Sequence, residues 1–225
     1  YIKSDTRGKI CKILDVKLQF NNISKDDYPS FPEITLKNAT FSIEDHIRHI
    51  EKIPPKVAEL IKKNGIAVIL GNGPVTGFRQ QKSLRHVQPR GWPEGSTWDT
   101  VAGSDGHPLV VLGTHGLAYE NMALHEIGHA FDHSKEGKEA TPDFSRDYEF
   151  RRLHQELKNR TVINPYYDQG GDAGPAELFA SIFATVFNKS DDDPQFEGSI
   201  SALRGYNTAY KPIIKYMESV ISGLS

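Results

Sequence analysis

Two histidines four residues apart, His125 and His129, constrain this chain more than any other feature. Around them, Leu124, Ile127 and Phe131 recur with the spacing of one helix face, which predicts an α-helix that buries this face in a core. Residues at positions i and i+4 of a helix lie one above the other, so both imidazoles can reach a single metal ion. The pair therefore predicts two ligands of one zinc ion.

Glu126 completes an H-E-x-x-H motif. It projects about 100° around the helix from His125, close enough to take a proton from a water held at the metal. The chain has nine histidines, and a chance match to the motif has a probability of roughly a few per cent. The motif alone therefore leaves an alternative open, a helix with two surface histidines and an ordinary solvated glutamate.

A catalytic zinc usually has three protein ligands and one open position, so the third ligand separates the possible classes. Metzincins would need a glycine at position 132 and a histidine at position 135, but the chain has Asp132 and Lys135, which excludes that class. Glu177 is the only acidic residue in the apolar run 175–187, where an isolated carboxylate is costly to bury unless it is paired or bound to metal. We expect Glu177 in the first turn of a helix that begins at Pro175, where the helix dipole favours a negative charge. An exposed glutamate without a ligand role is the alternative.

His133 continues the histidine spacing by one more turn. One helix face cannot easily bring three turns of side chains onto one tetrahedral ion, so we expect His133 outside the ligand set, either at the helix end or among the residues around the ligands. The remaining histidines are scattered, and each is expected to be a surface or core residue: His46, His49, His86, His107, His115 and His154.

The composition is typical of a soluble globular protein, and 225 residues are enough for one sizeable core. The single cysteine, Cys11, excludes an internal disulfide framework and a multi-cysteine zinc site. No run approaches the roughly 18 apolar residues of a membrane span. The first residues lack the features of a signal peptide, so we expect any export signal to have been removed or to lie upstream.

The net charge of −2 conceals an asymmetry between the two halves of the chain. Residues 1–90 carry 16 Lys and Arg against 9 Asp and Glu, a net +7, whereas residues 91–225 carry 11 against 20, a net −9. The acidic half, which contains the H-E-x-x-H motif, would suit a bound cation, although scattered acidic groups on exposed helices are the commoner cause. The basic half lacks a clustered stripe with interleaved aromatic residues, so we expect no nucleic-acid binding.

Periodicity and turn residues predict strands and helices in the first half and helices in the second. Ser42 is the expected N-cap of one helix, Pro54 and Pro55 its end, and Thr141 the expected N-cap of another. The expected elements are strands at 9–20, 66–70 and 108–112, a long structured loop at 91–106, and helices at 42–53, 56–63, around the motif, and at 141–158, 175–187 and 209–224.

The block from His125 to Asp132, with Glu177 following 48 residues after His129, resembles the anthrax lethal factor-like metallopeptidases. This family includes the catalytic domain of lethal factor and the clostridial Pro-Pro endopeptidases. A second block, from Pro89 through Trp98-Asp99 to Gly106, is similar to the substrate-loop region of the Pro-Pro endopeptidases. The resemblance covers roughly residues 85–190.

The resemblance implies a gluzincin-type site, with one Zn²⁺ ion held by His125, His129 and Glu177 and with Glu126 as the base. It also implies Arg90 and Trp92 as residues of a substrate-binding loop. An aromatic face beside a cation suits an extended peptide with prolines, and a structural tryptophan packed in a glycine-rich loop is the alternative.

Two departures from the family pattern bear on activity. The family has a tyrosine seven residues before the ligand glutamate that hydrogen-bonds the oxyanion, where this chain has Gly170. Tyr167 and Tyr166 lie ten and eleven residues before Glu177, so we expect Tyr167 in this role, with Tyr166 as the alternate.

The second departure is Ser181, which stands where relatives place a glutamate that supports a zinc-bound histidine. Serine can form a hydrogen bond but brings no charge. We therefore expect weaker metal affinity or a substitute carboxylate, for which Asp132 is the candidate.

These observations predict an α+β, zincin-like metallopeptidase formed by a single domain, residues 1–225. It would have an N-terminal α/β lobe of about residues 1–115 and a C-terminal helical lobe of about residues 116–225, which meet at a zinc cleft. Substrate would lie extended along the strand at 108–112.

The predicted function is that of a zinc endopeptidase that hydrolyses protein substrates by zinc-activated water. Its expected setting is secreted, either as a toxin catalytic domain delivered to host cytosol, with a role in virulence, or as an extracellular bacterial protease. Expected partners are a protein or peptide substrate with prolines and other domains of a larger chain, with no nucleic acid and no membrane span. The alternative is a catalytically inactive zincin-like docking or targeting module of a larger toxin.

Overall fold

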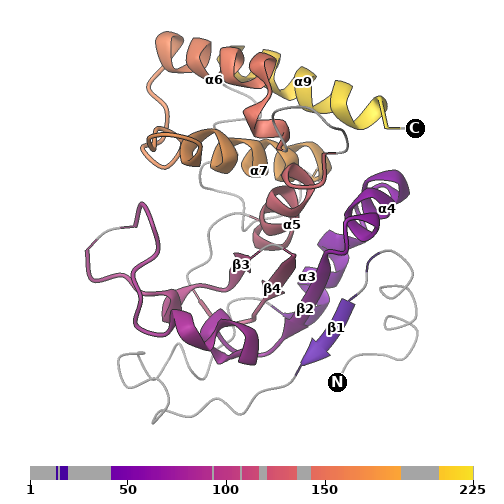
Figure 1. Ribbon diagram of the computed structural model, residues 1–225, viewed down its shortest axis with the longest axis vertical. Coiled ribbons are helices and arrows are strands. Elements are labelled where there is room, and N and C mark those ends of the chain that lie inside the picture. Colours follow the sequence, from indigo (N-terminus) through magenta and orange to yellow (C-terminus); the bar gives the residue numbers. More distant parts are fainter. Residues whose placement is uncertain are drawn as a thin grey trace.

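The computed structural model describes residues 14, 16–19, 42–92, 94–106, 108–116, 121–135, 143–188 and 208–224. These residues form a mixed α+β fold, in which a small sheet lies at one end and helices from the second half of the chain lie at the other (Figure 1). The strands are β1 (Val16–Gln19), β2 (Ala67–Gly71), β3 (Gly103–Asp105) and β4 (Leu109–Leu112). The α-helices are α3 (Ile43–Ile50), α4 (Pro55–Lys63), α5 (Met122–Asp132), α6 (Tyr148–Arg160), α7 (Ala173–Phe187) and α9 (Lys211–Ser222). Within these residues no helix is both long and apolar enough to cross a membrane.

The sheet has the strand order β1-β2-β4-β3. β1, β2 and β4 are parallel, whereas β3 pairs antiparallel with β4, so that Gly103 lies opposite Leu112. Alternate side chains of the two central strands point to opposite faces, as the period of two requires. Val68 and Val110 face the main core, which includes helices α3 to α5, whereas Ile69 and Val111 face the segment between β2 and β3.

The first two helices follow their predicted boundary signals. Ser42 and Asp45 form a capping box at the start of α3, because Ser42 Oγ accepts from the Asp45 N–H at 2.9 Å and the Asp45 carboxylate accepts from the Ser42 N–H at 3.1 Å. The helix ends before Pro54, and Pro55 is the first residue of α4. Gly65, with φ of +72°, follows α4 in the left-handed conformation that favours glycine.

Helix α5 lies at the centre of the molecule, between the sheet with α3 and the helices α6, α7 and α9 (Figure 1). It crosses α7 closely at Gly128, where a Cβ atom would lie only 2.9 Å from the Cα and the carbonyl oxygen of Ala180. Phe131 continues this contact by stacking on Phe179 and packing against Phe183. One continuous core therefore includes residues of both halves of the chain, from Leu14 to Met217.

The structure differs from the predicted elements in three places. β3 lies inside the stretch 91–106 that we expected to be loop, and it exists because Gly103–Asp105 pairs with β4. Helix α6 begins at Tyr148, after a 3-10 turn, η4 (Phe144–Arg146), whose Ser145 N–H donates to Asp132 Oδ1 at 2.6 Å. This bond holds the segment against α5, and the helix begins only after it. The predicted cap Thr141 lies outside the described residues.

The third difference concerns the start of α7. The helix begins at Ala173, two residues before the predicted start at Pro175. Glu177 therefore lies in the second turn of the helix and not in the first, so its position owes less to the helix dipole than we expected.

Candidate metal centre

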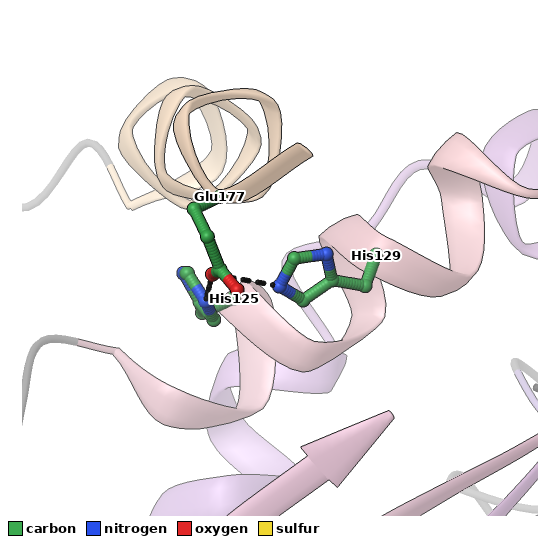
Figure 2. Close-up of side chains that lie close together, drawn as sticks. All are labelled: His125, His129 and Glu177. Carbon is green, nitrogen blue, oxygen red and sulfur yellow. Dashed lines mark hydrogen bonds and ion pairs between the residues drawn. The ribbon is translucent and has the colours of Figure 1, made fainter. Parts of the chain in front are cut away.

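Helices α5 and α7 bring the three predicted ligands together, as Figure 2 shows. α5 starts at the N-cap Asn121, whose side chain accepts from the Leu124 N–H at 3.2 Å, so the motif occupies its first two turns. Glu177 Oε2 lies 3.3 Å from His125 Nε2 and 3.1 Å from His129 Nε2. One carboxylate on α7 thus faces both imidazoles on α5.

This group fits a zinc ion. The nitrogen and oxygen donors lie within 4.8 Å of one another, and among the described residues this is the one group of three possible ligands that meets this limit. Zinc bonds of about 2.0–2.1 Å in tetrahedral geometry separate neighbouring ligand atoms by about 3.3 Å, which is close to the two distances from Glu177. Two imidazoles and one carboxylate are also a ligand set of catalytic zinc sites.

The charge on Glu177 is compatible with this role. Burial opposes ionisation of the carboxyl, but the charge and hydrogen bonds of His129 and His125 outweigh burial, so the pKa of Glu177 lies well below its usual range. The carboxylate is therefore ionised at neutral pH, as a metal ligand must be.

Glu126 lies beside this group, with its side chain buried in the same cavity. Burial raises the pKa of Glu126 to about 7, although His125 and His129 act in the opposite direction. A carboxyl group that titrates near neutral pH can both accept and return a proton. Gly103 of β3 leaves the room that this side chain needs, because a Cβ atom there would lie 2.8 Å from Glu126 Cγ.

Ser181 contacts one of the three predicted ligands, His125, at the ring nitrogen away from Glu177. Its hydroxyl oxygen lies 3.3 Å from His125 Nδ1, the ring nitrogen that does not face Glu177. Asp132, the predicted substitute carboxylate, does not take this place. Its Oδ1 accepts from the Ser145 N–H, and its Oδ2 has no hydrogen-bond partner among the described residues. Asp132 therefore holds η4 against α5, and the prediction that it replaces the missing glutamate is wrong.

A cavity of about 440 Å³ opens in front of the histidines. Arg90 and Trp92, which the resemblance places in a substrate-binding loop, lie on its wall together with Trp98. Tyr166 belongs to the wall formed by the segment before α7. The cavity thus joins the metal group to both parts of the chain that we expected to contact substrate.

The structure corrects our preference between the two tyrosines. Tyr167 is only 3% exposed and packs in the main core, whereas Tyr166 lines the cavity. Burial and the negative charges of Glu177 and Glu126 raise the pKa of Tyr166 far above its usual range, and a hydrogen bond with Trp92 acts in the opposite direction. The phenol therefore stays protonated and can donate a hydrogen bond into the cavity.

His133 is the C-cap of α5 and lies on another part of the cavity wall. Its Nδ1 lies 3.0 Å from Asp143 Oδ1, and its Nε2 lies 3.5 Å from Asp105 Oδ2. His133 is outside the metal group, as expected, and it links β3 to the segment before η4. The sequence signal that points to it is the second i+4 step, from His129 to His133.

The predicted substrate strand is also corrected. β4 pairs with β2 on one side and with β3 on the other, so its backbone groups at Leu109–Leu112 are not available to a peptide. Within the described sheet, β3 is the edge next to the cavity, and Asp105 at its end lines the cavity. An extended peptide can therefore add to β3 but not to β4.

Comparison with known proteins agrees with the fold and with the resemblance noted from the sequence. Residues 27–197 match the family model described as anthrax toxin lethal factor, N- and C-terminal domain. The chain is 26% identical over 163 residues to a Pro-Pro endopeptidase of Clostridioides difficile (strain 630), which covers 68% of each protein. The solved structure of a Pro-Pro endopeptidase from Paenibacillus alvei matches 96% of this chain and 99% of its own, with a TM-score of 0.60 and 20% identity.

Proposed function

Because this chain belongs to the anthrax toxin lethal factor family, we propose that it is a zinc-dependent endopeptidase of the gluzincin type, with a zincin-like arrangement of two lobes about the cavity. The observation that carries the proposal is the convergence of His125, His129 and Glu177 beside the buried carboxyl of Glu126. Both related Pro-Pro endopeptidases are named as peptidases, which supports the same reaction class.

His125, His129 and Glu177 would hold the ion. Zinc bound there would polarise the scissile carbonyl and make a water more acidic. Glu126 then accepts the proton of the attacking water and delivers it to the leaving amine. Burial raises the pKa of Glu126 and so makes it a stronger base, whereas the charge of a bound zinc would act in the opposite direction.

Tyr166 is the proposed oxyanion donor. Attack on the carbonyl places a negative charge on its oxygen, and a protonated phenol at the wall of the cavity can donate to it. The two departures from the family pattern, the displaced tyrosine and Ser181, are what would favour an inactive docking module. The position of Tyr166 on the cavity wall weakens this alternative, and Ser181 contacts the ligand ring of His125.

The proposed substrate is an extended peptide with prolines, paired with the edge of β3. Gly103–Asp105 pairs with β4 on one side only, and Trp92 and Trp98 lie on the wall of the cavity. Proline rings pack well on aromatic side chains. A proline has no backbone N–H, so it requires no hydrogen-bond acceptor on the strand. The names of both relatives support a proline-containing substrate.

We further propose that the enzyme acts outside the cell that makes it, as a secreted protease or a delivered toxin domain that forms part of a larger chain. This setting rests on the family resemblance and stays a prediction. It is tested by following the natural protein in culture supernatant and cell fractions, where retention in the producing cell would contradict it.

The experiment that tests the function compares wild type, Glu126→Gln and Glu177→Gln in zinc content and in cleavage of a proline-containing peptide library. Wild type should bind one zinc per chain and cleave. Glu126→Gln should keep its zinc and lose about a thousandfold in kcat, whereas Glu177→Gln should lose zinc. The matched control Glu59→Gln changes an exposed glutamate on α4 and should behave as wild type. Stoichiometric zinc in wild type without cleavage of any peptide or host lysate protein would favour the docking module.

A further inference from the structure

A loop between β2 and β3 brings aromatic side chains to the cavity. We define the Trp loop as residues 86–98, of which the structure describes all but residue 93. Its two ends are joined by the Trp98 N–H, which donates to the Val87 carbonyl at 2.9 Å. Arg90 and Trp92 lie on the wall of the cavity between these ends, so the conformation of this loop determines the shape of that wall.

Asp99 is the buried carboxylate at the base of the Trp loop, with only 1% of its surface exposed. Its Oδ1 accepts from Thr76 Oγ1 at 2.7 Å, and its Oδ2 accepts from the His86 N–H at 3.0 Å and from Thr97 Oγ1 at 3.3 Å. His86 and Thr97 belong to opposite ends of the loop, whereas Thr76 belongs to η1 (Val75–Gly77), which packs beneath the sheet. One side chain therefore ties both ends of the loop to the core.

His86 has an unusual backbone conformation that this contact explains. Its φ is +60°, and no other described residue except glycine has a positive φ. Non-glycine residues adopt this conformation at a steric cost. The His86 side chain is 65% exposed, and its Nδ1 lies 3.0 Å from Asp99 Oδ2, so the ring as well as the N–H contacts this carboxylate. The bond from its N–H to Asp99 requires the chain to turn at this residue, and the ring contact reaches the same oxygen.

The Trp loop also touches the segment that carries Tyr166. A Cβ atom on Gly91 would lie 2.7 Å from the side-chain amide of Gln169, so loop and segment are in close contact. Gln169 Nε2 in turn donates to the Tyr166 carbonyl at 2.9 Å. A shift of the loop would therefore alter the wall that holds Arg90 and Trp92 and would disturb the neighbouring wall with Tyr166.

We propose that Asp99 is a positioning residue for the substrate, which acts through the backbone of His86. It fixes the turn at the start of the Trp loop and holds the end of the loop at Thr97. Arg90 and Trp92 are thereby kept at the cavity wall without contact between Asp99 and the substrate. This inference rests on the proposed function, since it assigns the loop to peptide binding.

Three variants separate the backbone link from other effects. Asp99→Asn removes the charge. The asparagine amide has one acceptor oxygen, whereas Asp99 accepts from Thr76, His86 and Thr97 with two. His86→Pro lacks the N–H and fixes φ near −65°, so it breaks the same link from the other side. His86→Gly is the matched control, because it removes the ring and its contact with Asp99 but keeps the N–H and readily adopts a positive φ, so it isolates the backbone link.

The first readout is steady-state cleavage of a proline-containing peptide by the zinc-loaded protein. Asp99→Asn and His86→Pro should raise KM about tenfold and change kcat less than about threefold, because they weaken binding and leave Glu126 in place. His86→Gly should stay within about twofold of wild type in both constants. An unchanged KM in Asp99→Asn, or a loss in His86→Gly as large as that in His86→Pro, would overturn the proposal.

The second readout needs no activity. Trp92 and Trp98 are the two tryptophans of the whole chain, and both belong to the Trp loop, so intrinsic fluorescence reports this loop. Asp99→Asn and His86→Pro should increase acrylamide quenching, whereas His86→Gly should match wild type. If peptides are not cleaved but quenching follows this order, the proposed function fails and the positioning by Asp99 stands; equal quenching in all variants refutes the positioning.

Loss of folding in Asp99→Asn would not end the test. Thr97→Val removes only the bond of 3.3 Å to Asp99, at the end of the loop, and replaces the hydroxyl with a methyl group of similar size. It should raise both KM and quenching by a smaller factor than His86→Pro. Wild-type values of both quantities in a folded Thr97→Val and a folded His86→Pro would contradict the proposal.

Discussion

The hydroxyl oxygen of Ser181 lies 3.3 Å from Nδ1 of His125, while Nε2 of the same ring faces Glu177 at 3.3 Å. The serine on α7 therefore helps to orient a ligand ring on α5, at the position where relatives were expected to carry a glutamate. A neutral, long hydrogen bond restrains the ring less than a carboxylate would, and groups behind metal ligands typically change affinity by about 10–100-fold.

We predict that Ser181→Ala weakens zinc binding by about threefold to tenfold, at or below the lower limit of this range, because the hydrogen bond is neutral and long. The measurement is competition with a chromophoric chelator. Thr185→Val is a matched control, since Thr185 lies one turn further along α7 and donates only to the Ser181 carbonyl. Equal zinc affinity of Ser181→Ala and wild type would show that the contact does not support the ligand.

The tyrosines yield a second prediction. Tyr166→Phe should lower kcat about a hundredfold with little change in KM and full zinc content, because the lost hydroxyl acts on charge that develops during the reaction. Tyr167→Phe should retain most of kcat, since its ring lies in the core. Steady-state kinetics on one peptide decides between the two residues, and the reverse order would restore Tyr167 as the oxyanion donor.

The sequence predicted the helices that carry the ligands, but it did not predict which of the two tyrosines lines the cavity. His125 and His129 share a face through helix periodicity alone, and Glu177 stood out as an isolated carboxylate in an apolar run. Which neighbouring tyrosine faces the cavity depends on a turn, where the Asn164 side chain accepts from the Tyr166 N–H at 2.9 Å and its carbonyl accepts from the Tyr167 N–H at 2.8 Å. Sequence spacing cannot specify this turn.

Long-range pairing caused the other differences. Gly103–Asp105 has the sequence Gly-Ser-Asp, which has low strand propensity, and it becomes β3 only because β4 offers a partner edge. The alternation at Val16 and Leu18 was sufficient to predict β1, which the structure confirms for Val16–Gln19. The rest of the predicted strand at 9–20, apart from residue 14, lies outside the described residues.

A third prediction concerns removal of the metal. Zinc that binds only the folded state at a thousand times its dissociation constant adds about 4 kcal/mol to the free energy of unfolding. Wild type should therefore lose thermal stability when treated with a chelator and recover it when zinc is returned. Glu177→Gln should show a much smaller shift, whereas Glu59→Gln should match wild type. A chelator effect of equal size in Glu177→Gln would contradict the ligand assignment.

A fourth prediction follows from His46, whose side chain is 1% exposed and whose Nε2 donates to the Gly113 carbonyl at 2.7 Å. Burial lowers the pKa of His46 from 6.5 to about 4. The folded protein therefore binds this proton less readily than the unfolded chain does. The stability from neutral His46 is fully present above about pH 6.5 and is lost as the pH falls toward 4, by at most about 3 kcal/mol.

Urea denaturation at several pH values between 7.5 and 4 measures this effect. His46→Gln can still donate to the Gly113 carbonyl but does not titrate. The free energy of unfolding of this variant should fall less steeply with decreasing pH than that of wild type, and the remaining slope is due to other groups. Parallel curves for the two proteins would exclude His46 as a source of acid sensitivity.

The last prediction concerns the crossing of α5 and α7, which sets the distance between the histidines and Glu177. At Gly128 a Cβ atom would lie 2.9 Å from the backbone of Ala180, so Gly128→Ala must push the helices apart. Overpacking of this kind costs about 1–3 kcal/mol, which exceeds or matches the gain of about 1 kcal/mol from better helix propensity.

Gly170→Ala is the control, since Gly170 has open space around it and no positive φ. Gly128→Ala should lower zinc affinity about tenfold in chelator competition, because moving α7 withdraws Glu177 from both rings. Wild-type zinc affinity in Gly128→Ala would show that the close crossing is not needed to assemble the site.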